Sequence, residues 1–191
     1  MPRGIARDHD QKREAIRKGA AEYFAAHGFD RASMTGAARH CGVSKALIYH
    51  YYDSKEALLH DILCAHLTEL AETARGLDPE AGLEALVCAI LEVYEDADAE
   101  HKLQIDALSV LPEDLQAPLI ALQRDLVNIM SDTLVREAPG LAGTDRLRPV
   151  TMSVFGILNW FYMWHRPGKG LTRESYSKLA TDMVLNGIRG L

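Results

Sequence analysis

Two short helical segments joined at Gly42 constrain the fold of this 191-residue chain more than any other feature of its sequence. Ser33 precedes the segment Met34–His40, and Ser44 precedes the segment Lys45–Tyr51. Serine is a preferred N-cap residue because its side-chain oxygen accepts a hydrogen bond from a free N–H of the first helical turn. Glycine permits the tight turn between the two segments. The pattern therefore predicts a helix-turn-helix.

The rest of the chain also shows helical spacing of its apolar residues. No run of β-branched or aromatic residues alternates with a period of two, so we expect an all-α fold of about nine helices. Asp53 followed by Glu56 reads as a capping box that opens a long fourth helix. Glycine and proline mark most of the later breaks. The other helices are expected near residues 9–27, 79–96, 100–110, 113–137, 146–165 and 172–189, with the fourth running to about residue 75.

Charge is distributed unevenly along the chain. Residues 1–55 hold ten Lys and Arg against six Asp and Glu, whereas the whole chain has a formal net charge of −6. A basic N-terminal segment on an acidic remainder points to a polyanionic partner at one end of the molecule. An uneven solvated surface explains the charges equally well, so the charges alone do not decide between these readings.

The sequence also indicates where the chain acts. It holds no apolar stretch of about 18 residues and no apolar core of a signal peptide, so we expect neither a membrane partner nor secretion. The three cysteines, Cys41, Cys64 and Cys88, are unrelated in spacing and fit a reducing compartment. We therefore expect a cytoplasmic location.

The second helix of the helix-turn-helix is rich in groups that suit a DNA major groove. A lysine in its first turn can meet a guanine edge or a phosphate, small apolar side chains can touch thymine methyls, and tyrosine hydroxyls can donate to phosphates. Serines at helix N-termini, where free N–H groups favour phosphate, add to this set. Any one of these residues could instead be an ordinary solvated side chain. The candidate DNA contacts are Ser33, Ser44, Lys45, Ala46, Leu47, Tyr49, His50, Tyr51 and Lys55.

The segments YFAAHGFDRASM and CGVSKALIYHYYDSKEALL resemble the DNA-binding head of the TetR family of transcriptional regulators. The resemblance covers roughly residues 10–60, and many positions agree in order and spacing. It departs from the family pattern at Ala37, where a larger aliphatic residue is usual, and at Cys41, where alanine is usual. Both departures are small changes in packing.

The resemblance implies an all-helical homodimer that binds a near-palindromic operator, usually as a repressor that a small molecule releases. It implies a DNA-binding domain over residues 1–53 and a ligand-binding and dimerisation domain over residues 54–191. It also places Ser33, Thr35, Lys45, Ala46, Tyr49, His50, Tyr51 and Lys55 where the family contacts DNA.

The last two expected helices are the candidates for a dimer interface. The helix near 146–165 is apolar nearly all round, so we expect it to be buried on more than one side, with one side against a partner subunit. A thick monomeric core is the alternative. The candidate interface residues are Phe155, Leu158, Tyr162, Tyr176, Leu179, Met183 and Val184.

By the same resemblance, the ligand pocket is expected among helices four to eight. Asn159 lies on an otherwise apolar helix and needs a hydrogen-bond partner. Each apolar candidate could equally be an ordinary core residue. The candidate ligand-binding residues are Leu63, Leu67, Leu91, Tyr94, Leu108, Leu126, Met130, Asn159, Trp160, Met163, Trp164 and Arg166.

Residues 156–170, GILNWFYMWHRPGKG, resemble the C-terminal part of TetR-type regulators that respond to acyl-CoA thioesters. An acyl chain would suit the apolar interior, and the CoA phosphates would suit Arg166 and Lys169. A solvated turn, or a drug-like or aromatic inducer, fits these residues as well. Whatever the ligand, we expect it to favour one tilt of the fourth helix and so to change the spacing of the two recognition helices.

Other classes of function have less support in the sequence. His60 and Cys64 share one face of the fourth helix and could belong to a metal or redox sensor, but no third and fourth ligand is evident. Phosphate-loop, nucleophile-elbow, HExxH and paired CxxC motifs do not occur, so we expect neither an enzyme nor a bound cofactor. A nonspecific DNA-packaging protein would not need the large acidic body.

Overall fold

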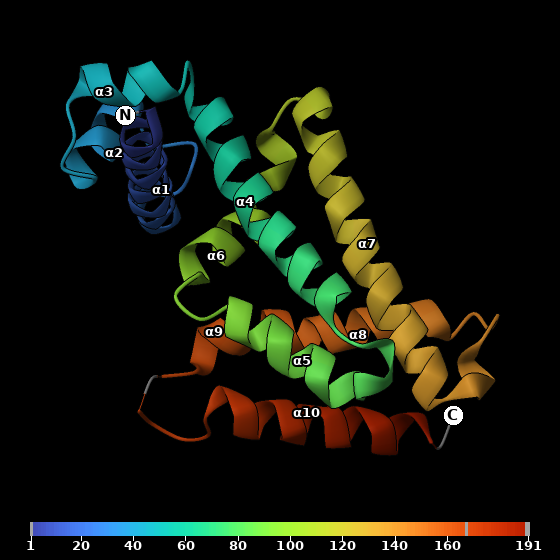
Figure 1. Ribbon diagram of the computed structural model, residues 1–191. Helices are drawn as coiled ribbons and strands as arrows, with labels where there is room; N and C mark the ends of the chain where they lie inside the picture. Colours follow the sequence, from blue (N-terminus) through green and yellow to red (C-terminus); the bar gives the residue numbers. More distant parts are fainter. Residues whose placement is uncertain (1, 167, 190–191) are drawn as a thin grey trace. The chain divides into compact units, whose positions relative to one another are not determined.

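The described part of the chain is entirely helical (Figure 1). The computed structural model describes residues 2–166 and 168–189, with side chains from residue 9 onward. Within these residues there are ten α-helices and three 3-10 helices, and the only β-type pairing is an isolated bridge between Arg166 and Lys169. The expected all-α class is confirmed. The elements are α1 (Pro2–His27), α2 (Met34–His40), α3 (Lys45–Tyr51), α4 (Lys55–Gly76), η1 (Pro79–Ala81), α5 (Gly82–Val93), α6 (Asp98–Ala107), η2 (Leu108–Val110), α7 (Glu113–Glu137), η3 (Pro139–Leu141), α8 (Leu147–Asn159), α9 (Phe161–Trp164) and α10 (Arg173–Ile188).

Several helix ends differ from the sequence-based expectation. Helix α1 begins at Pro2 instead of residue 9, and proline suits a first helical turn because its fixed φ is already helical. The prediction that Asp53 caps the fourth helix is wrong. Ser54 caps it instead, because its Oγ accepts a hydrogen bond from the N–H of Ala57. The helix expected over 79–96 is interrupted at Gly82, whose φ of +80° lies in the left-handed region.

The helix expected over 146–165 is divided into α8 and α9 at Trp160. Trp160 has φ −91° and ψ −6°, which departs from regular helical geometry. The preceding residue, Asn159, is bonded through its side chain to Tyr94 of α5. The apolar composition of this stretch therefore conceals a break, and the break accounts for ten α-helices where nine were expected.

The chain forms two compact units. The first comprises residues 1–66 and 97–119, and so contains α1 to α3, the first half of α4, and α6. Helix α1 packs against both α2 and α6 in this unit (Figure 1). The predicted functional division at residue 53 concerns DNA-binding and ligand-binding roles, and it stays a prediction. The fully buried side chains of the first unit include Ile16, Phe24, Ile48, Leu58, Leu59 and Leu63.

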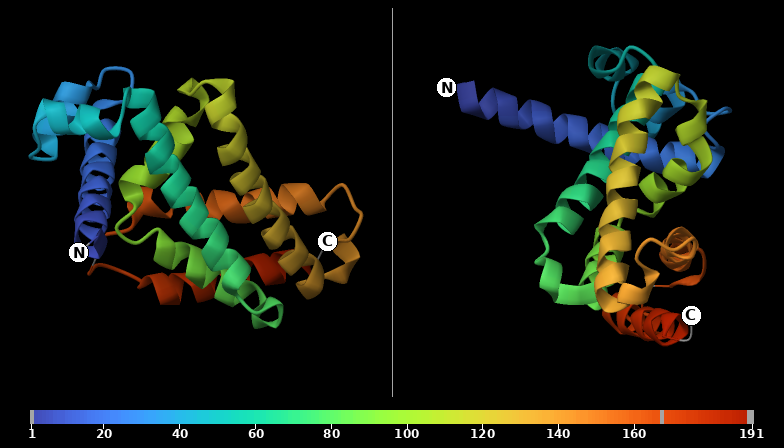
Figure 2. Two further views of the ribbon diagram at one scale, coloured as in Figure 1. Left: turned by 45° about the horizontal axis from the view of Figure 1, so that its top comes forward. Right: turned by 90° about the vertical axis from the view of Figure 1, so that its right-hand side faces the viewer.

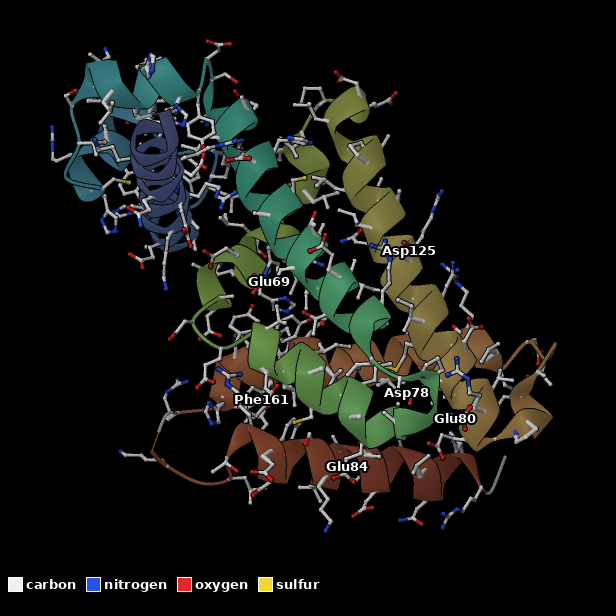
Figure 3. The ribbon with its side chains drawn as sticks, in the orientation of Figure 1. Glu69, Asp78, Glu80, Glu84, Asp125 and Phe161 are labelled. Atoms are coloured by element: carbon white, nitrogen blue, oxygen red, sulfur yellow. The ribbon has the colours of Figure 1, made fainter. Side chains whose placement is uncertain are left out.

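The second unit comprises residues 67–96 and 120–191, with α5, most of α7, and α8 to α10. Helix α10 runs along α5 (Figure 1) and also contacts α8; the right-hand view of Figure 2 shows α8 and α10 both nearly end-on. Near the end of α4, Arg75 is paired with Asp125, which Figure 3 labels on α7. The buried side chains of this unit include Leu83, Leu86, Leu91, Met130, Leu134, Leu158 and Phe161.

No helix among the described residues is both long enough and apolar enough to cross a membrane.

Helix α3 depends on one side chain for its place in the core, and this can be tested. Ile48 is its only fully buried residue. The substitution Ile48→Ala should lower the free energy of unfolding by about 2–5 kcal/mol, because it removes buried methyl groups and leaves a cavity. Ile105→Ala on the exposed side of α6 is the matched control and should change that free energy by less than about 0.5 kcal/mol. Urea unfolding followed by circular dichroism measures both. Equal effects of the two substitutions would contradict the packing described for α3.

Candidate functional site

The helix-turn-helix forms as expected from α2 and α3. The Oγ of Ser33 accepts a hydrogen bond from the N–H of Gly36 at 3.1 Å, and the Oγ of Ser44 accepts one from Leu47 at the same distance. Gly42 between the helices has φ +67°, a conformation that glycine adopts without steric cost. Both serine caps and the glycine turn are therefore confirmed.

Helix α3 divides into a buried side and an exposed side. Ile48 and the following Tyr52 are buried, whereas Tyr49 is 42% exposed. The ammonium of Lys45 lies 5.7 Å from the centroid of the Tyr49 ring, one helical turn away. The exposed side carries most of the predicted DNA contacts, so a polyanion can reach them. These exposed residues are Ser44, Lys45, Ala46, Tyr49 and His50 on α3 and its cap, with Ser33 and Thr35 at the start of α2.

Two of the predicted DNA contacts on α3 are less exposed than the others. Leu47 is half-buried. Tyr51 is half-buried as well, because its ring packs 4.7 Å from that of His9 on α1 and its hydroxyl donates to the carbonyl oxygen of His9 at 3.5 Å. The contact of His9 with α3 was not predicted, because nothing in the spacing of His9 in the sequence links it to that helix.

Lys55 has a structural role that the sequence did not predict. Its ammonium donates to the carbonyl oxygens of Phe29, Asp30 and Ala32 at 3.0, 3.3 and 3.5 Å. It also lies 4.5 Å from the centroid of the Phe29 ring. An ammonium has three N–H donors, and all three are engaged here. Lys55 therefore fastens the start of α4 to the loop after α1, and its expected phosphate contact is not supported by this geometry.

A further polar cluster in the first unit was also missed. The carboxylate of Asp61 on α4 accepts hydrogen bonds from the Tyr52 hydroxyl at 2.6 Å and from the Arg13 guanidinium at 2.6 and 3.1 Å. Burial and the hydrogen bond to Asp61 raise the pKa of Tyr52 well above its ordinary value, so the hydroxyl stays protonated. No sequence pattern links residues that lie 48 positions apart, as Arg13 and Asp61 do.

In the second unit, the expected partner of Asn159 is found. The hydroxyl of Tyr94 on α5 donates to its side-chain oxygen at 2.9 Å. Tyr94 is buried, and burial raises the pKa of its hydroxyl. This bond ties the end of α5 to the end of α8.

The candidate ligand-binding residues fall into an exposed group and a group that is buried or half-buried. One group is exposed: Trp160 is 59% exposed, Met163 and Trp164 are similar, and Arg166 donates to the carbonyl oxygens of Met163 and His165. The expectation that these four line an interior pocket is not supported. They lie at or after the break at Trp160. The other group comprises Leu67, Leu91, Tyr94, Leu126 and Met130, buried in the second unit, and Leu63 (buried) and Leu108 (half-buried) in the first.

The candidate interface residues divide in a similar way. Phe155 and Leu158 are buried inside the second unit, so their expected place at the subunit interface is not supported. They lie on the inward side of α8, which fills its own core first. Leu179 and Met183 on α10 are exposed, as an interface requires, and Tyr162, Tyr176 and Val184 are half-buried.

Exposed apolar residues of α8 and α10 border a groove of about 300 Å³. Its lining is apolar apart from Ser153 and includes Val150, Ile157 and Met183. Phe161, which Figure 3 labels on α9, is buried and belongs to an aromatic cluster that the sequence did not reveal. Its ring lies 4.7 Å from Tyr176 and 5.1 Å from Trp164.

The alternative metal site gains no further ligands from the structure. Among residues whose side chains are described, no group of three or more His, Cys, Asp or Glu is placed to hold a metal ion.

Comparison with known proteins identifies the family. Residues 16–62 match the family model described as bacterial regulatory proteins, tetR family. Residues 76–188 match the Tetracyclin repressor-like, C-terminal domain. This chain belongs to the TetR family. It is a DNA-binding transcriptional regulator, and the resemblance seen in its sequence is confirmed.

Similar proteins include regulators of known structure. The HTH-type transcriptional repressor KstR2 of Rhodococcus jostii is 29% identical over 185 residues, covering 88% of this chain and 87% of the relative. A TetR-family transcriptional regulator from Bordetella parapertussis is 33% identical, with a TM-score of 0.85 and coverage of 94% and 96%. AibR, solved in complex with isovaleryl coenzyme A and operator DNA, shares the fold at 24% identity, with a TM-score of 0.73 and coverage of 91% and 96%.

The different positions of Lys45 and Lys55 lead to opposite expectations for this TetR-family regulator. Lys45→Ala should flatten the slope of log affinity against log salt by about 0.9 for each subunit bound to DNA, because each subunit loses one phosphate contact. Lys55→Ala should leave that slope unchanged and lower the free energy of unfolding by about 1–2 kcal/mol, because it releases three carbonyl groups. Fluorescence anisotropy at several salt concentrations and urea unfolding measure the two effects. Arg124→Ala, on the exposed side of α7, is the control for general charge. A slope lowered by Lys55→Ala and not by Lys45→Ala would contradict these roles.

Proposed function

We propose that this protein represses transcription by binding a near-palindromic operator as a homodimer and that an apolar or acyl-CoA-like ligand releases it. The observation that carries the proposal is the exposed side of α3, where Lys45, Tyr49 and His50 project from a helix capped at Ser44. A helix held by its buried side can place its exposed side in a major groove. Operator DNA lies in the cytoplasm of a bacterium, and we place the protein there.

The requirement for a dimer follows from the small size of the helix-turn-helix. One copy offers few base contacts, whereas a two-fold dimer doubles them and spaces its recognition helices by about 34–36 Å, one turn of DNA. The exposed apolar side chains of Met152, Leu179 and Met183 support an interface through α8 and α10. Grouped apolar residues of this kind mark a surface that another molecule covers.

The second unit combines two environments that suit the two parts of an acyl-CoA thioester. Its interior is apolar, and its surface near α9 presents two tryptophans beside Arg166 and Lys169. An acyl chain suits the first environment, and the adenine and phosphates of coenzyme A suit the second, since aromatic rings stack on bases and cations bind phosphates. AibR, which shares the fold, was solved with isovaleryl coenzyme A and operator DNA, and this supports the same ligand class here.

The proposed release acts through α4, which begins in the first unit at Lys55 and ends in the second at Gly76. A ligand that fits one tilt of α4 better than another shifts the population toward that tilt. A coupling of about 1–3 kcal/mol would weaken operator binding roughly 5- to 150-fold, and the operator would weaken ligand binding by the same factor.

Operator affinity in the presence of acyl-CoA thioesters tests this proposal. The operator would be the duplex that the protein selects from random-sequence DNA. We expect one member of a series that includes isovaleryl-CoA to weaken binding roughly 5- to 150-fold, while coenzyme A alone has no effect. Lys169→Gln should raise the concentration of that thioester needed for release, and Lys178→Gln on the exposed side of α10 should not. Operator affinity that is unchanged by every thioester would remove the ligand class and leave the DNA-binding role intact.

A further inference from the structure

Asp61, on α4 in the first unit, carries a carboxylate that joins three helical elements. Its side chain is only 16% exposed. One oxygen accepts from the Tyr52 hydroxyl and from the Nε of Arg13, and the other accepts from the Nη2 of Arg13. Arg17 stands 3.9 Å away on the same side of α1. The carboxylate therefore connects α1, the residue that ends α3, and the second turn of α4.

The negative charge of Asp61 disfavours the binding of a polyanion by the basic residues that precede it. Residues 1–55 carry an excess of positive charge, which suits a polyanion, yet Asp61 occupies the guanidinium of Arg13 and adds a negative charge. Removing a carboxylate from water is unfavourable unless its oxygens are hydrogen-bonded. Both oxygens of Asp61 are hydrogen-bonded, so its burial is compensated. Because its charge repels phosphate, any contribution of Asp61 to DNA binding comes from the geometry that it imposes on its neighbours.

Apart from the contact of Tyr51 with His9, few interactions hold helix α3 in place. It has seven residues, and Ile48 is the only one that is fully buried. Tyr52, which follows it, is buried as well, and its N–H donates to the carbonyl oxygen of Ile48 at 3.0 Å. The Tyr52 hydroxyl then anchors this end of α3 to Asp61, while Figure 1 shows α1, α3 and the start of α4 meeting at this end of the head.

We propose that Asp61 is a positioning residue for sequence recognition. Through Tyr52 and Arg13 it holds α3 at one orientation on α1 and α4. Base edges are read by hydrogen bonds of defined geometry, whereas phosphate contacts tolerate small shifts of a helix. Loss of the Asp61 connection therefore weakens operator binding and spares nonspecific binding.

The substitution Asp61→Asn separates this role from a simple effect of charge. If Asp61 contributed charge alone, its neutralisation would strengthen binding to every duplex, because repulsion from phosphates would fall. As a positioning residue, its neutralisation lowers affinity for the selected operator roughly tenfold or more, the range expected for a lost charged hydrogen bond. Affinity for a scrambled duplex stays the same or rises. Anisotropy titrations of both duplexes at one salt concentration give the ratio.

Asp53→Asn is the matched control, since Asp53 is an exposed carboxylate directly after Tyr52. It should strengthen binding to both duplexes alike. Tyr52→Phe keeps the buried ring and removes only the hydroxyl, so it should fold and still lower the operator-to-scrambled ratio. Thermal unfolding of each variant confirms that the head is folded.

The double variant gives the decisive result. Because Tyr52 and Asp61 act through one bond, Tyr52→Phe with Asp61→Asn should lose little more operator affinity than the weaker-binding single variant. Arg13→Lys, which keeps the charge and loses the fork of two donors, should give an intermediate loss. Equal strengthening at both duplexes by Asp61→Asn, or fully additive losses in the double variant, would overturn the proposal.

Discussion

The DNA-binding head depends on the attachment of a very short helix to its neighbours. An isolated helix of seven residues is not stable in water, because nucleation is unfavourable and few hydrogen bonds follow it. Helix α3 exists because Ser44 caps it, Ile48 fills the core beneath it, and Tyr52 closes its other end. Its exposed side is free for DNA only because its other side is fully used for attachment.

Local features of this fold could be predicted from sequence, and long-range ones could not. The caps at Ser33 and Ser44 and the turn at Gly42 were predicted correctly, since each depends on residues within a few positions of one another. The hydrogen bonds of Lys55 and the ion pair of Arg13 with Asp61 join residues 23 to 48 positions apart, and no periodicity in the sequence indicates such pairs. The positive charge of Lys55 led to the prediction that it contacts phosphate. In the structure its ammonium is hydrogen-bonded to backbone carbonyl groups.

The wrong predictions for the second unit also arise because local sequence does not report long-range packing. A stretch that is apolar nearly all round gives no sign of which side faces its own core, so Phe155 and Leu158 were assigned outward and lie inward. The break at Trp160 carries no glycine or proline signal. Asn159 was the one informative residue there, because a polar group on an apolar helix requires a partner, and Tyr94 supplies it.

The departures from the family pattern in the head are compensated locally. The Sγ of Cys41 occupies space beside Gly19, where a Cβ would lie 2.9 Å from it. The additional atom of cysteine over alanine is therefore accommodated by the absence of a side chain on α1. Ala37 is fully buried on α2, and Gly36 beside it leaves room for the Tyr23 hydroxyl.

We propose that two copies of α3, presented by a homodimer, read neighbouring turns of one face of DNA. Hydroxyl-radical footprinting on the duplex selected from random sequence tests it most directly. We expect two protected half-sites related by two-fold symmetry, with centres about 10–10.5 base pairs, or a multiple of one helical turn, apart. A single protected half-site, or uniform protection without sequence preference, would contradict it.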